Sequence, residues 1–159
     1  MGNEITIGTA PVSELNMIAI TDASFIMVYR KTGNTTATNV QGAVRLGVVT
    51  SVNDNTIIAA DEVPIGLVGG YGFKRGIPIF LGGNKFAIAW EHTDVDVGGN
   101  WLGSGSIAIG NIGGGSTGNR GVAIGGALKF GSYVSDLNGA SFNDNKNVVL
   151  VYREQNALK

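Results

Sequence analysis

A chain of 159 residues is long enough to bury one hydrophobic core, but it is too short for two domains of ordinary size. Charged residues make up 14% of the chain, and its 11 basic and 12 acidic side chains leave a net charge of −1, which excludes the strong positive field expected of a nucleic-acid-binding protein. Because the chain has no cysteine, disulfides and thiolate metal sites are excluded too.

The N-terminal residues 1–5 contain no basic region followed by an apolar stretch. No later window approaches the roughly 20 apolar residues that span a bilayer. We therefore expect no signal peptide, no membrane span and no nucleic-acid partner. Assembly in the cytoplasm followed by release, as for a virion protein, is the expected route to a virion or extracellular surface.

The first predicted elements are a strand over Ile5–Val12 and the tract Pro11–Ile18, which is the only place where a short helix competes. An apolar strand follows at Phe25–Arg30. It recurs 61 positions later as Phe86–Glu91, and again 62 positions later as Val148–Arg153. A cluster of turn-forming residues precedes each copy, so turn, apolar strand, aromatic residue and charge form the pattern that the copies share.

The segments between these copies also correspond. Gly42–Gly47 matches Gly105–Gly110 in its alternation, and Ile57–Ile65 matches Val122–Phe130. With 26 glycines marking the turns, the pattern predicts one all-β domain built of small antiparallel sheets. The predicted divisions are a partial unit over 1–17, repeats over 18–78 and 79–139, and a partial unit over 140–159.

The recurring strand, an aromatic or apolar residue followed four positions later by Tyr29, Trp90 or Tyr152, resembles the repeats of β-propeller proteins, including bacterial surface proteins and lectin-like modules. This resemblance implies sheets of about 61 residues arranged as blades. A propeller has about four to eight blades, so two full units would close a ring only if other copies of the chain completed it. A β-sandwich is the alternative architecture.

A second, local resemblance is carried by Ser106–Gly110 and Gly121–Gly126, which are similar to the S-x-A-I-G repeats in the heads of trimeric adhesins and in phage fibres. Those heads contain many successive copies, whereas this chain has two. The resemblance implies a β-roll over this part of the chain only.

The best candidate ligand site is the loop that contains Asp94, Asp96, Asn100 and Trp101, because the first repeat has no equivalent of it. Loop aromatics of this kind stack on sugars or cover a subunit contact. The loop also has the acidic spacing of a calcium site, but the later acidic residue that would complete the site is missing, so we predict no metal. Tyr29, Trp90 and Tyr152 lie at equivalent strand ends and are expected in the core.

No catalytic arrangement is predicted. His92 is the only histidine, its neighbours Glu91 and Asp94 are too close in sequence to define a triad, and no nucleophile motif accompanies them. The carboxylates offer no basis for a facing pair. We therefore expect a non-enzymatic protein without a cofactor.

The unpaired partial units predict self-association. In a homo-oligomer, Ile5, Ile7 and Val12 at one end and Val148, Leu150 and Tyr152 at the other would form exchanged strands. These features favour a structural assembly protein, such as a virion surface, decoration or fibre component that contacts itself and other virion proteins. A lectin-like, glycan-binding module is the alternative.

Overall fold

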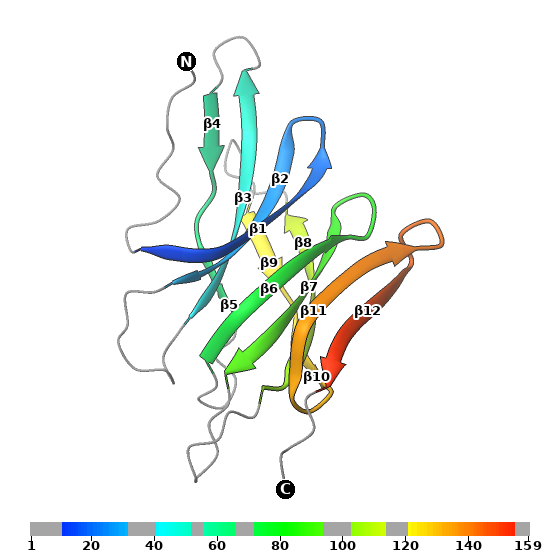
Figure 1. Ribbon diagram of the computed structural model, residues 1–159. Coiled ribbons are helices and arrows are strands. Elements are labelled where there is room, and N and C mark those ends of the chain that lie inside the picture. Colours follow the sequence, from blue (N-terminus) through cyan, green and yellow to red (C-terminus); the bar gives the residue numbers. More distant parts are fainter. Residues whose placement is uncertain are drawn as a thin grey trace, which may run out of the picture.

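The computed structural model describes residues 11–31, 41–51, 56–65, 72–93, 103–113 and 121–154, and every regular element in these ranges is a β-strand (Figure 1). All strand pairs are antiparallel, and one of the sheets curls into a half-barrel. The prediction of an all-β, antiparallel protein is confirmed. No helix with the length and apolarity needed to cross a membrane occurs in these ranges.

The strands form two five-stranded sheets and one hairpin. The first sheet contains β1 (Val12–Thr21), β2 (Ser24–Lys31), β3 (Gly42–Ser51), β4 (Thr56–Ala59) and β5 (Val63–Ile65). The second sheet contains β6 (Gly72–Phe80), β7 (Lys85–Thr93), β8 (Gly105–Gly113), β9 (Gly121–Ile124) and β10 (Leu128–Phe130). The terminal hairpin contains β11 (Val134–Phe142) and β12 (Asn147–Glu154).

The two sheets have the same connectivity. In each, three long strands pair in chain order, and two short strands then pair with different parts of the third strand, one after the other along its length. These short strands are β4 and β5 on β3, and β9 and β10 on β8. The terminal hairpin repeats the first two strands of this pattern. The division points predicted at 18, 79 and 140 fall inside β1, β6 and β11, because each hydrogen-bonded group begins one strand before the recurring apolar strand.

The first strand of every group carries a β-bulge at a corresponding place. The pairing register shifts between Ser13 and Asn16 in β1, between Phe73 and Arg75 in β6, and between Ser135 and Asn138 in β11. In β1 the bulge includes Glu14, whose φ of 52° lies in the left-handed region. The tract Pro11–Ile18, where a short helix competed in the sequence, therefore lies in a strand. Its sequence did not show the alternation typical of a strand because the bulge adds a residue there.

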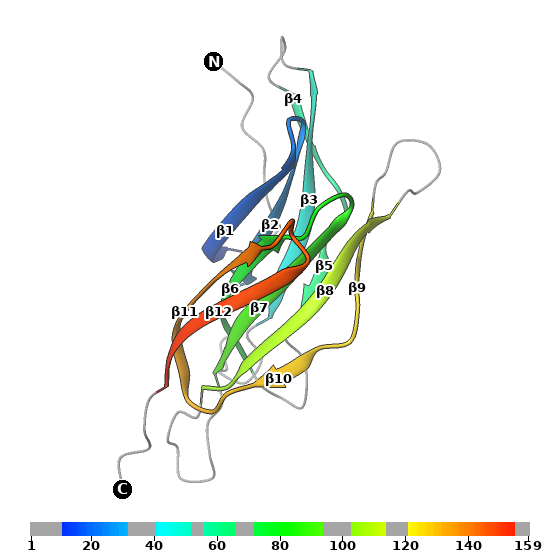
Figure 2. The same cartoon turned by 90° about the vertical axis from the view of Figure 1, so that its right-hand side faces the viewer.

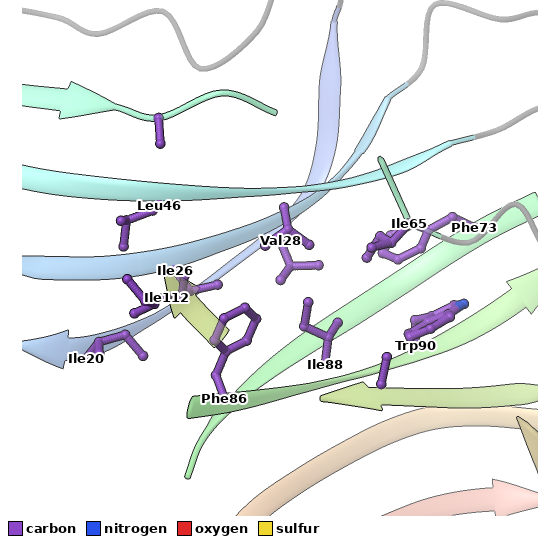
Figure 3. Close-up of a cluster of buried hydrophobic side chains, with 13 residues drawn as sticks. Ile20, Ile26, Val28, Leu46, Ile65, Phe73, Phe86, Ile88, Trp90 and Ile112 are labelled. Carbon is purple, nitrogen blue, oxygen red and sulfur yellow. The ribbon is translucent and has the colours of Figure 1, made fainter. Parts of the chain in front are cut away.

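The three layers pack face to face, with the second sheet in the middle (Figure 2). The larger core lies between the two sheets, where Ile26 and Val28 of β2 meet Phe86, Ile88 and Trp90 of β7 (Figure 3). A smaller core lies on the other side of the second sheet. There Ala87 and Ala89 of β7, with Ile77 and Ile79 of β6, receive Val134 and Leu137 of β11.

The two sheets also share a cross-strand contact between an aromatic ring and a glycine. Phe25 is paired with Gly47, and Phe86 with Gly110. In each pair the ring lies over the glycine so closely that a Cβ built there would fall within 2.6 Å of the ring atom Cε2. The repeat is therefore conserved between the two sheets in side-chain packing as well as in strand order.

Candidate functional site

Each layer has one face that is directed toward the next layer along the chain, which we call the forward face. Its centre is a cross-strand pair: Ile18 with Ile26 in the first sheet, Ile79 with Ala87 in the second, and Ala140 with Val149 in the terminal hairpin. Ile26, Ala87 and Val149 are separated by 61 and then 62 positions. The three pairs occupy the same place in the repeat.

The forward face differs in burial between the layers. In the first two it is covered: Ile26, Val28, Ala87 and Ala89 are all fully buried. In the terminal hairpin the equivalent side chains are exposed, Val149 by 46% and Val151 by 64%. We call the set Ala140, Phe142, Val149 and Val151 the terminal face.

Phe142 extends the terminal face along β11. It is 54% exposed and lies 61 positions after Leu81, which packs against the smaller core. Monomeric proteins seldom leave large apolar side chains grouped on neighbouring strands uncovered, and such groups mark interaction surfaces. The terminal face is apolar where the two earlier forward faces are apolar, but no layer of the described chain covers it.

The hairpin is also incomplete at its edge. β2 pairs with β1 and β3, and β7 pairs with β6 and β8, whereas among the described strands β12 pairs only with β11. The open edge runs along Asn147–Tyr152, which has no lysine or proline of the kind that protects natural edge strands. A strand with the sequence of an inner strand therefore stands at the end of the stack.

The opposite end of the stack is covered at its centre, although Met17 on β1 is 60% exposed there. On the outward side of the first sheet, Met27, Tyr29 and Ala43 are buried. The Tyr29 hydroxyl donates a hydrogen bond of 2.8 Å to Glu62 Oε2, and Lys31 Nζ lies 2.5 Å from Glu62 Oε1. Burial, and then the hydrogen bond to the Glu62 carboxylate, raise the pKa of Tyr29 above its ordinary value. The hydroxyl is thus held neutral under a polar cover.

Glu91 fastens the hairpin to the second sheet. Its side chain is 1% exposed, Oε1 accepts a hydrogen bond of 2.8 Å from the backbone N–H of Leu137, and Oε2 lies 2.9 Å from Lys74 Nζ. Leu137 lies within the bulge of β11, where its N–H is not used by the ladder. The buried carboxylate therefore has a structural role.

His92 and Ser106 form the arrangement closest to catalytic chemistry. His92 Nε2 lies 2.7 Å from Ser106 Oγ, but the two residues are only 2% and 4% exposed. Glu91 cannot orient the imidazole, because adjacent residues of a strand point to opposite faces and His92 lies beside Trp90, with ring centroids 5.8 Å apart. The pair lies in the interior, where a substrate has no access to the hydroxyl.

In the described ranges no three acidic or histidine side chains are grouped as a metal site requires.

The predicted site residues divide into two groups. Asp94, Asp96, Asn100 and Trp101, together with Ile5 and Ile7, lie outside the described residues. The others are placed as follows: Val12 begins β1 opposite Lys31 and is 36% exposed, Val148 and Leu150 pack against the smaller core, and the Tyr152 ring lies 5.5 Å from that of Phe130.

Sequence reasoning selected the side of β12 that faces inward and missed Val149 and Val151 on the outward side. A signal was present, because Val148–Tyr152 is apolar at every position. A continuous apolar run is typical of a strand buried on both faces, whereas a strand that borders solvent alternates.

No protein-family model matches this chain, and no curated protein or solved structure is significantly similar to it.

Proposed function

We propose that this chain is a non-enzymatic structural protein that works by self-association, of the class that serves as virion surface, decoration or fibre components. The observation that carries this proposal is the terminal face: positions that are buried in the first two layers are apolar and exposed in the third. Apolar residues at these exposed positions of the terminal hairpin are suited to burial in a contact with another molecule.

The composition supports the same function. With 14% charged residues and a net charge of −1, the chain has little charge to keep separate copies apart. The pair that most resembles catalytic residues, His92 and Ser106, is buried within the second sheet. A glycan-binding role would depend on Trp101 and its loop, which lie outside the described residues, so no contact favours it over assembly.

The test is the mass of the purified chain in solution. We expect analytical ultracentrifugation to give a species heavier than the 16.4 kDa monomer, with a population that rises with protein concentration. Electron microscopy of the same sample then shows the shape of the assembly. A monomer that persists at all accessible concentrations would contradict the proposal.

A further inference from the structure

We propose that the terminal face binds the same face of a second copy of this chain, so that two terminal hairpins pack against each other across a two-fold axis. This inference rests on the proposed function and names the surface responsible for it. Three features of the molecule lead to it.

The first feature is the kind of partner that the forward face accepts elsewhere in the chain. The forward face of the first sheet is covered by Phe86 and Ile88 of the next layer, and that of the second sheet by Val134 and Leu137. Both partners are apolar faces of antiparallel strands. The partner of the terminal face is therefore expected to be an apolar β-sheet face stacked at the usual spacing of about 10 Å.

The second feature concerns which faces of this chain are available. In a head-to-tail arrangement, the outward side of the first sheet would receive the terminal face of another copy. The centre of that side is already covered, because Met27, Tyr29 and Ala43 are buried and Glu62 is engaged by Tyr29 and Lys31, although Met17, the cross-strand partner of Met27, is 60% exposed at its β1 border. The terminal hairpin is open, so a contact of like with like is favoured.

The third feature is that the terminal face suits self-pairing. Val149 and Val151 alternate along β12 beside Ala140 and Asn138 of β11, which gives a continuous surface whose central side chains are uncharged. Charges lie at both ends of this surface: Asp136 and Arg153 form an ion pair of 3.0 Å with each other, and Asp144 and Lys146 lie in the turn that follows Phe142. The uncharged centres of two such faces can meet, and a two-fold contact is the commonest way for identical chains to pair.

The decisive perturbation is Val151→Asp, because this side chain is 64% exposed and its replacement leaves both cores intact. In the proposed dimer it would place an unpaired carboxylate from each copy inside an apolar contact, so we expect the dimer to dissociate at least about 100-fold more readily. The matched control is Met17→Asp on β1, since Met17 is 60% exposed and lies outside the terminal face. Sedimentation velocity at several concentrations measures all three proteins, and circular dichroism verifies that each is folded.

A second measurement tests the symmetry. The chain has no cysteine, so Val151→Cys introduces a single thiol. Across a two-fold axis near β12 the two thiols meet, and we expect mild oxidation to give a disulfide-linked dimer with a yield that falls on dilution. Met17→Cys should remain unlinked under the same conditions.

The outcomes separate the inference from the proposed function. If the wild-type chain associates but Val151→Asp associates equally well, self-association stands and the terminal face is the wrong surface. If Val151→Asp is monomeric but Val151→Cys does not cross-link, the face binds another part of the second copy and the two-fold arrangement is wrong. A wild-type chain that stays monomeric overturns both.

Discussion

Replacing Gly110 by alanine tests whether the ring-on-glycine contact holds the second sheet together. A Cβ at this position would lie 2.6 Å from Cε2 of Phe86 and 2.2 Å from Cζ, so either the ring or strand β8 must move by about 1 Å or more to restore ordinary van der Waals contact. Phe86 is fully buried in the larger core, so a displaced ring would press against its neighbours there. Overpacking of this kind costs about 1–3 kcal/mol.

The replacement also has a favourable effect, because alanine restricts the unfolded chain and stabilises by about 0.4–1 kcal/mol where the backbone permits it. We therefore expect Gly110→Ala to lower the free energy of unfolding by about 1–2 kcal/mol. The matched control is Gly121→Ala on β9, where a Cβ would meet nothing within 4 Å, so only the favourable effect applies. Urea unfolding measures both, and their midpoints should move in opposite directions.

A double-mutant cycle assigns the cost to the ring. In a Phe86→Leu background the side chain opposite Gly110 is smaller, and we expect Gly110→Ala to cost at least about 0.5 kcal/mol less there than in the wild-type chain. If Gly110→Ala proves as stable as Gly121→Ala, or costs the same in both backgrounds, the contact between ring and glycine does not limit the packing of this sheet.

Two further predictions concern the carboxylates. Glu91→Ala leaves the buried N–H of Leu137 without its acceptor and should cost about 2–3 kcal/mol in urea unfolding, whereas Glu91→Gln keeps an acceptor and should cost about 1 kcal/mol; equal costs would mean that the hydrogen bond is unimportant. For Glu62, burial is the largest single influence and raises the pKa, but the hydrogen bonds from Lys31 and Tyr29, together with the positive charges of Lys31 and Arg45, hold the pKa below its ordinary value of 4.5. Its contribution to stability is therefore complete above about pH 4.5 and is lost as the pH falls through the lowered pKa, so Glu62→Gln should reduce the difference in urea midpoint between pH 7 and pH 3. An unchanged difference would contradict this assignment.

The sequence predicted much of the fold, because its strongest signals were local. The recurrence of Phe25–Arg30 as Phe86–Glu91 and Val148–Arg153 identified β2, β7 and β12, and the match of Gly42–Gly47 with Gly105–Gly110 identified β3 and β8. The segments Ile57–Ile65 and Val122–Phe130 were each expected to be one strand, but each contains two short ones. The burial of Tyr29 and Trp90 was also predicted correctly from their equivalent strand ends, but the same prediction was wrong for Tyr152, which is 37% exposed because no layer of the described chain follows β12.

What the sequence did not reveal depends on contacts between distant residues. The bulges that begin near Ser13 and Ser135 add a residue to each of these first strands, and this hides the alternation that would have marked where β1 and β11 begin. The continuous apolar run of β12 does not say which of its two sides forms the terminal face, since Val149 is outward only in relation to a core formed with the second sheet. The role of Glu91 required the position of Leu137, which is 46 residues away in the chain.

The stacking of layers in one direction has a consequence for how such a protein can change in evolution. Every layer presents the same kind of forward face and covers the one before it, so duplication of the segment that encodes residues 72–130 would add a layer that fits both of its neighbours. The length of the stack could then grow or shrink by whole layers, while the first sheet and the terminal hairpin remain unchanged. In such a lineage, the distance between the two ends would be set by a count of duplications, independently of the residues that make each contact.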